Sequence, residues 1–261
     1  GLLMASSSLT MLATAASSSD APVIWSIADP FDLVIDVPVG ETLIWPTPVN
    51  SPGAIVKRGG GTLVLDLANT HEGGLIVEAG TVVIRHSGAI NGGPLVIWDG
   101  GRVIFDSDAT GMTEPSIPVA ALDLAEGGLL DIEWTALDVS EGGFTAENLR
   151  VSLLRGRNGP SGITSRAAAG GTRAVAYVIN RDGSARVSFA AAGDVDLNRT
   201  VDVFDLVGIN GAGRYGTGTA SVWSEGDFNY DGVTNVFDVV AVNTAGAFGR
   251  GDYSPLKPAL A

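Results

Sequence analysis

Cysteine is absent from this chain of 261 residues, and histidine occurs only twice, as His71 and His86. A chain without cysteine forms no disulfide and performs no thiolate chemistry. The two histidines lie far from the acidic clusters of the sequence, so a histidine-based zinc site or a Ser-His-Asp triad has little to build from. We therefore expect no thiol chemistry and no histidine-dependent catalytic centre.

Basic residues are scarce, because 15 lysines and arginines stand against 29 aspartates and glutamates, for a net charge of -14. Such a surface repels nucleic acid and anionic membranes, and hard cations are its natural counter-charge. A membrane-spanning run is also missing. The uncharged first 19 residues are interrupted by serine and threonine and are too short to cross a bilayer. We expect no nucleic-acid partner and no membrane span.

The N-terminal segment reads GLLMASSSLTMLATAASSS and resembles the apolar half of a secretory signal without its basic start. Apolar residues alternate at Leu9, Met11, Ala13 and Ala15, which fits a strand better than a helix. We interpret residues 1–21 as an apolar arm or strand. It is either the first strand of a domain in the same chain, or an arm that pairs with a neighbouring copy by strand addition.

Glycine is abundant, with 36 residues, and it separates short β-branched runs between residues 22 and 192. None of these runs is long and periodic enough for a helix, so the sequence predicts an all-β domain over 22–192. Two types of run recur every 19 to 21 residues, one starting at Gly61, Gly80 and Gly101, the other at Gly73 and Gly92. This period indicates a β-solenoid, whose coils bury their apolar faces on one another. A β-sandwich with similar hairpins is the alternative.

One part of this domain carries a family resemblance. The stretch VKRGGGTLVLDLANTHEGGLIVEAGTVVI, from Val56 to Ile84, resembles the autotransporter-associated β-strand repeat. The resemblance implies a large secreted bacterial protein with a β-helical stalk. It places the chain outside the cell or on the cell surface.

The composition changes at residue 193. The segments AAGDVDLNRTVDVFDLVGIN and SEGDFNYDGVTNVFDVVAVN are a duplication that places Asp194 and Asp227 33 residues apart. An apolar run of helical character follows each acidic loop. We therefore expect a small α-helical module over 193–253, followed by a tail over 254–261.

Both acidic loops have the ligand spacing of an EF-hand-type calcium loop, in which positions 1, 3, 5, 7, 9 and 12 supply oxygen atoms. Oxygen-only ligands in a flexible loop favour calcium over magnesium or a transition metal. The sequence therefore predicts two Ca²⁺ ions. The first would be held by Asp194, Asp196, Asn198, the Thr200 carbonyl, Asp202 and Asp205. The second would be held by Asp227, Asn229, Asp231, the Val233 carbonyl, Asn235 and Asp238.

Two such loops in tandem, each closing on aspartate, resemble the type I dockerin family. The resemblance implies a compact two-helix module that depends on its two calcium ions. Arg199 stands where the turn glycine is expected, which should strain the first loop. Positions 10 and 11, where dockerins carry hydroxyl residues that recognise cohesin, are Val203-Phe204 and Val236-Phe237. These residues suit an apolar contact with the β domain or with another subunit.

The sequence as a whole predicts a non-enzymatic extracellular structural protein that is stabilised by calcium and self-assembles into a surface or matrix filament. Its expected partners are other copies of itself, with a cohesin-like or cell-surface protein as a further option. The alternative is a glycan-binding or glycan-cleaving solenoid attached through its dockerin-like module. Asp131 and Glu133, expected on one face of a strand, are the best carboxylate pair for such an enzyme.

Overall fold

The structure is a computed structural model that describes residues 10–13, 23–28, 31–106, 108–112, 116–140 and 145–253. The chain forms two compact units, residues 1–130 and 131–261. The acidic loops therefore share a unit with residues 131–192. Each unit is described separately below.

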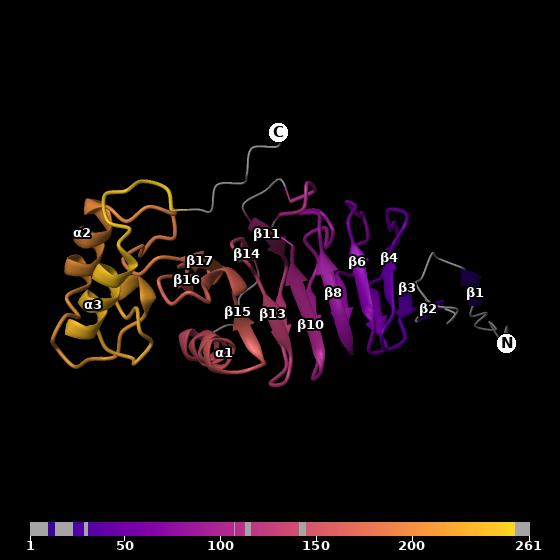
Figure 1. Cartoon of the computed structure of the whole chain (residues 1–261), viewed down its shortest axis with the longest axis horizontal. Coiled ribbons are helices and arrows are strands. Elements are labelled where there is room, and N and C mark those ends of the chain that lie inside the picture. The colour runs from indigo at the N-terminus through magenta and orange to yellow at the C-terminus, as the bar shows by residue number, and fades with distance from the viewer. Residues whose placement is uncertain are drawn as a thin grey trace. The chain divides into compact units, whose positions relative to one another are not determined.

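The first unit is a β-solenoid built from two ladders of parallel strands, and Figure 1 shows the strands of one ladder lying side by side. Five successive coils of its described part each give one strand to the first ladder. That ladder consists of β3 (Asp32–Asp36), β5 (Ile55–Arg58), β7 (Leu75–Val77), β9 (Leu95–Ile97) and β12 (Leu122–Leu124). The second ladder contains β4 (Thr42–Ile44), β6 (Thr62–Leu65), β8 (Gly80–Ile84) and β10 (Gly101–Phe105).

The parallel ladders confirm the predicted solenoid and rule out the sandwich for these residues. In the same sheet as the second ladder, β13 (Leu129–Asp131) lies next to β10, and the short strand β11 (Ser116–Val119) precedes β12 in the chain. The expected bounds of the solenoid-like domain, 22–192, stay a prediction.

Stacked aliphatic side chains form the core of the solenoid. Ile55, Leu75 and Leu95 lie in register in one ladder and are fully buried. In the second ladder, Leu63, Val82 and Val103 are likewise in register and fully buried. Each coil thus covers the apolar face of the next, and burial of this kind contributes roughly 25 cal/mol per Å² of apolar surface.

The glycine pairs that recur in the sequence form tight corners between coils. A Cβ on Gly73 would lie 2.4 Å from the carbonyl carbon of Gly53, and one on Gly74 would lie 2.1 Å from the carbonyl oxygen of Pro94. Gly74 also has a φ of +75°, which is unfavourable for residues with a Cβ. The repeat therefore reflects backbone contact between coils that leaves no space for a side chain.

A lysine occupies a core position of the first ladder. Lys57 is fully buried in register with Ile35 and Val77. Its Nζ donates hydrogen bonds to the carbonyl oxygens of Arg58 (2.6 Å), Gly59 (2.7 Å) and Ala79 (3.2 Å). Burial lowers the pKa of Lys57 to about 8, although Asp36 opposes this shift. The side chain ties the corners of two successive coils together.

Part of the N-terminal segment is a strand. Thr10–Ala13 (β1) pairs antiparallel with β2 (Val23–Ala28) of the same chain, and β2 pairs antiparallel with β3. This pairing corresponds to the interpretation in which the segment belongs to its own domain. The pairing does not test the alternative, in which this strand pairs with a neighbouring copy of the chain. The rest of residues 1–21 lies outside the described residues.

The second unit combines antiparallel strands with helices. Strand β17 (Ala185–Ala190) lies between β14 (Ala136–Val139) and β16 (Ala174–Ile179). The remaining elements are α1 (Ala146–Asn158), β15 (Gly162–Thr164), the 3-10 helix η1 (Arg166–Ala168), α2 (Val203–Ala212), the 3-10 helix η2 (Trp223–Glu225) and α3 (Val236–Ala245). Both expected helices after the acidic loops are present. Over the described ranges, none of the helices has the length and apolar content to cross a membrane.

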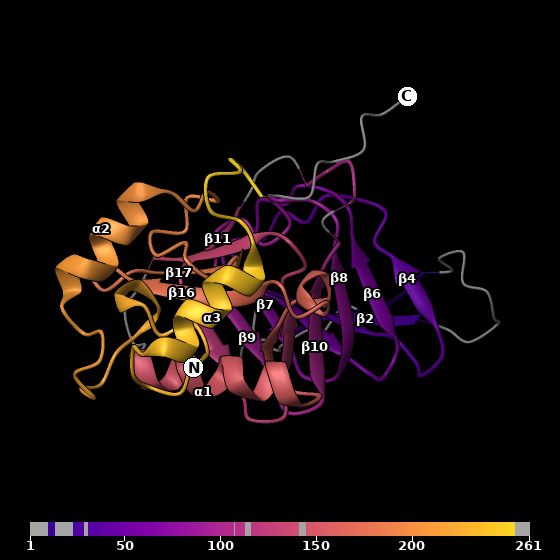
Figure 2. The same ribbon diagram turned by 60° about the vertical axis from the view of Figure 1, so that its left-hand side comes forward.

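Helix α1, of 13 residues, shows that the prediction of an all-β region over 22–192 is wrong (Figure 2). Thr145 caps its start by accepting a hydrogen bond from the Asn148 N–H (3.0 Å). Leu149 and Leu153, four residues apart, are buried. Because only this narrow apolar stripe is present, the segment lacks the periodicity that marks a helix in the sequence, while its cap and its basic last turn are the signals that could have identified it.

The glycine corners lead to a prediction for the stability of the solenoid. Gly74→Ala should destabilise the protein by about 2–4 kcal/mol, because the new Cβ meets the Pro94 carbonyl and the backbone has positive φ. Gly100→Ala is the matched control. It also has positive φ, +82°, but its Cβ would meet nothing within 4 Å, so we expect a loss of about 1 kcal/mol. Urea unfolding followed by circular dichroism measures both losses, and equal losses would contradict the packing argument.

Candidate metal centre

The two acidic loops, residues 194–205 (the first loop) and 227–238 (the second loop), have the same backbone conformation. Left-handed residues occur before the first aspartate and at the fourth and sixth positions of each loop. They are Gly193, Leu197 and Arg199 in the first loop, at φ 108°, 57° and 72°, and Gly226, Tyr230 and Gly232 in the second, at 105°, 64° and 92°. The duplication seen in the sequence is therefore a duplication of backbone geometry. Arg199 adopts the left-handed conformation for which glycine was expected.

The last aspartate of each loop fastens the loop to the helix that follows. Asp205 accepts hydrogen bonds from the N–H groups of Val195 and Asp202, both at 2.8 Å. Asp238 does the same with Phe228 (2.7 Å) and Asn235 (2.8 Å). Each carboxylate thereby completes a capping box at the start of α2 or α3. The helices begin where the loops close.

The first loop brings three predicted ligands together. Carboxylate oxygens of Asp194, Asp196 and Asp205 lie within 4.8 Å of one another, and Asp194 and Asp205 are buried. Burial raises the pKa of Asp194 to about 6 and also raises the pKa of Asp205. Negative charges held this close in a buried place repel one another, and a hard cation bound between them would offset the repulsion.

The first loop's other predicted ligands bond to neighbouring loop atoms. Asn198 donates to Asp196 Oδ2 (3.0 Å) and accepts from the Thr200 N–H (2.8 Å). Asp202 accepts from the Phe204 N–H (2.7 Å) as the N-cap of α2. These side chains thus form hydrogen bonds within the loop, and Asp202 is not part of the group of Asp194, Asp196 and Asp205.

The second loop contains a buried carboxylate oxygen without a partner. Asp227 is fully buried, and its Oδ2 accepts the Gly232 N–H at 3.0 Å. Its Oδ1 has no hydrogen-bond partner within the part of the chain that the structure describes. Burial raises the pKa of Asp227 to about 6. An unpartnered buried carboxylate oxygen is costly, and cation coordination is one chemistry that would satisfy it.

Three more predicted ligands of the second loop are joined by hydrogen bonds. The side-chain amides of Asn229 and Asn235 donate to Asp231 Oδ2 at 3.0 and 3.3 Å. Val233 follows the left-handed Gly232, as Thr200 follows Arg199 in the first loop. The loop therefore gathers oxygen-bearing side chains, but it has two amides where the first loop has carboxylates.

Sequence reasoning missed the residues that hold the loops from outside. The Tyr253 hydroxyl donates to Asp194 Oδ2, and its N–H donates to the Arg199 carbonyl (3.0 Å). Trp223, which is fully buried, donates from Nε1 to the Asp194 carbonyl (2.6 Å) and packs edge-on against Phe228. A lone tyrosine and a lone tryptophan at these distances in sequence carry no pattern that points to the loops.

The helices after the loops expose their apolar residues. Phe204 and Phe237 are 75% and 65% exposed. The other exposed members are Val203, Leu206 and Val207 on α2 and Val236, Val239 and Val240 on α3. We call these two sets the apolar faces. Val203-Phe204 and Val236-Phe237 are therefore not covered by residues 131–192, the part of the expected β domain that lies in the same unit. Their contact with another subunit stays a prediction.

The carboxylates considered for catalysis are held in an ion-pair cluster. Asp131 ends β13, whereas Glu133 lies in a left-handed turn at φ 51°, so the two do not share a strand face as predicted. Arg166 forms ion pairs with both, through Nε to Asp131 Oδ2 (2.8 Å) and through Nη2 to Glu133. Two carboxylates that are both ion-paired with one guanidinium are a poor general acid and base.

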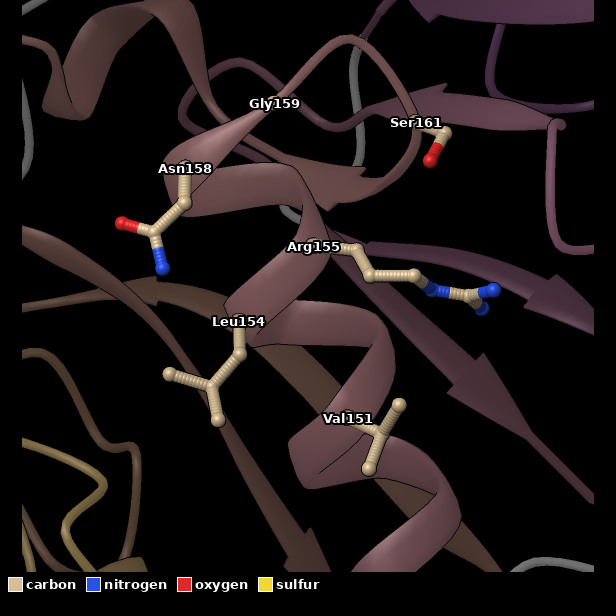
Figure 3. Close-up of a pocket in the computed structure, with 6 residues that line it drawn as sticks. All are labelled: Val151, Leu154, Arg155, Asn158, Gly159 and Ser161. Carbon is tan, nitrogen blue, oxygen red and sulfur yellow. The ribbon is translucent and has the colours of Figure 1, made fainter.

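A shallow depression at the end of α1 gives no better candidate for catalysis. It has a volume of about 380 Å³ and is lined by Val151, Leu154, Arg155, Asn158, Gly159 and Ser161 (Figure 3). The side chains of Arg155 and Asn158 point in opposite directions. Its lining holds neither a carboxylate nor a histidine.

Comparison with known proteins supports the interpretation of the solenoid. Residues 55–84 match the family described as passenger-associated-transport-repeat (PATR), which agrees with the resemblance read from residues 56–84. A stretch of 101 residues is 35% identical to the adhesin BmaC autotransporter of Brucella suis biovar 1 (strain 1330). That stretch is 39% of this chain and 3% of the adhesin, so the chain spans a very small part of this relative. No solved structure matches.

Proposed function

We propose that the chain is a non-enzymatic, surface-exposed or secreted segment of a bacterial protein of the adhesin type, in which the solenoid serves as a stalk. The observation that carries this proposal is the match of residues 55–84 to a passenger repeat, on the same residues that form β5 to β8. The resemblance to an autotransporter adhesin supports the same location. The ion pairs that Arg166 forms with both Asp131 and Glu133 support a role without catalysis.

The location is tested on intact bacteria that produce the protein. Antibodies against the purified chain should label whole cells, or detect the protein in the medium, without permeabilisation. A cytoplasmic protein serves as the control for cell integrity. Labelling that requires permeabilisation, with none in the medium, would contradict the proposal.

We further propose that the two acidic loops form a dockerin-like module that binds two Ca²⁺ ions for stability. The matching left-handed positions, the clustered carboxylates of the first loop and the unpartnered Oδ1 of Asp227 support this. The ligands would be those expected from the sequence, ending in Asp205 and Asp238. The bound cations would supply positive charge where Asp194 and Asp227 are buried.

Calcium titration of the purified chain tests the module. Isothermal titration calorimetry should show two bound ions, and Asp194→Ala and Asp227→Ala should each remove one. Calcium at 100 times its dissociation constant should stabilise the module by about 2.7 kcal/mol per site. Because the pKa of Asp194 and of Asp227 is about 6 without cation, protons compete below that pH. Affinity should therefore fall by about tenfold per pH unit below pH 6, and pH-independent binding would contradict these ligands.

We propose that the apolar faces contact a second copy of the chain. Asp205 and Asp238 are the only charged residues of α2 and α3, and both are buried, so neither apolar face carries charge. Two copies that each carry a net charge of -14 can therefore meet here with least repulsion. Because α2 and α3 carry the same exposed pattern, two copies could pair isologously and repeat the contact.

Sedimentation velocity tests the self-association. In calcium, the chain should form dimers or larger species, and Phe204→Ser with Phe237→Ser should return it to monomer. Phe31→Ser, a change of another exposed phenylalanine in the first unit, is the matched control and should not. A chain that stays monomeric at about 100 μM would contradict self-association and would favour a different, cohesin-like or cell-surface partner.

A further inference from the structure

The second loop is connected to helix α1 by hydrogen bonds to its backbone. Arg150 Nη2 donates to the carbonyl oxygen of Tyr230 (2.7 Å), and Arg157 Nη1 donates to that of Asn229 (3.3 Å). Both arginines lie on α1, and both acceptors are adjacent residues, at the third and fourth positions of the loop. The direction of these carbonyl groups depends on the loop backbone, including the left-handed Tyr230 at φ 64°.

Tyr230 fixes the same part of the loop to the strands. Its hydroxyl donates to the carbonyl oxygen of Val175 on β16 (2.5 Å). Its ring stacks against Tyr177 with centroids 6.4 Å apart and lies 5.6 Å from the ring of Trp223. The fourth residue of the loop is therefore a packing residue of the second unit, and a change in loop conformation would disturb α1 and β16 together.

The two loops differ in how well their first aspartate is satisfied without a cation. Asp194 accepts the Asn198 N–H through Oδ1, and it accepts the Arg199 N–H and the Tyr253 hydroxyl through Oδ2. Asp227 is equally buried, but its Oδ1 has no partner in the described part of the chain. A buried unpartnered carboxylate oxygen favours local opening until a cation or water satisfies it. A cation should therefore stabilise the second loop more than the first.

We propose that cation binding in the second loop is coupled to the docking of α1, so that the helix is firmly held only when this loop is filled. The first loop has no such role, because Trp223, Gly249 and Tyr253, which hold it from outside by hydrogen bonds, do not belong to α1. This proposal rests on the calcium binding proposed above. If it holds, α1 and the second loop respond to calcium together. The calcium-binding residues would then not form a module that is independent of the residues before 193.

Hydrogen exchange measured by mass spectrometry on the full chain tests the coupling. Peptides covering residues 145–159 should exchange about tenfold faster in EDTA than in 2 mM calcium. Asp227→Asn should show the fast exchange even in calcium, whereas Asp194→Asn should stay slow. Equal behaviour of the two variants, or exchange that does not respond to calcium in the unmodified chain, would overturn the coupling.

Two arginine variants separate the coupling from a general loss of folding. Arg150→Met removes the bond to Tyr230 and keeps every loop ligand. Calorimetry should still show two calcium ions, while the exchange of 145–159 should no longer depend on calcium. Arg155→Met is the matched control on the same helix, since Arg155 donates to Ser152 (3.2 Å), and it should keep the dependence. If Arg150→Met keeps the calcium dependence too, the proposal is wrong.

If calorimetry of the unmodified chain detects no bound calcium, the calcium proposal fails, and the coupling fails with it.

Discussion

The burial of Asp194 and Asp227 is the constraint on which the second unit depends. A carboxylate removed from water needs hydrogen-bond donors, positive charge or a proton. The loops supply backbone donors by placing residues at left-handed φ at the fourth and sixth positions, which turns successive N–H groups inward. Their closing aspartates cap α2 and α3, so the geometry that surrounds the buried charge also determines where both helices begin.

The solenoid is also built from a repeated sequence, but its repeats form an apolar core and do not surround a buried charge. Its coils repeat aliphatic residues in register, and glycine corners let the backbones of neighbouring coils touch. In the solenoid, each repeated coil adds apolar contact with the coil before it. In the second unit, the repeat instead gives two acidic loops with the same backbone conformation. Lys57 is the exception within the solenoid. Its charge is tolerated in the core because three carbonyl oxygens at the coil corners accept hydrogen bonds from its Nζ.

The parts that could be predicted from the sequence are those set by local repetition. The spacing of Gly61, Gly80 and Gly101 predicted the coils, because each coil must return to the same corner. The acidic spacing predicted two equivalent loops, followed by helices. Helix α1 was missed because only Leu149 and Leu153 mark its buried side among many polar residues. Arg150 and Tyr253 could not be assigned to the loops at all. They reach them across 80 and 59 residues, and no periodic pattern encodes such contacts.

The loops also explain why α2 and α3 expose so much apolar surface. Each helix contains one charged residue, Asp205 or Asp238, and each of these is turned into its loop to accept two or more backbone N–H groups. The carboxylate that closes the loop is therefore unavailable to the surface of the helix. What remains outside is valine, leucine and phenylalanine. A loop that lost its closed conformation would free this aspartate and place a charge next to Phe204 or Phe237. Loop closure and an uncharged apolar face are in this way two consequences of the same side chain.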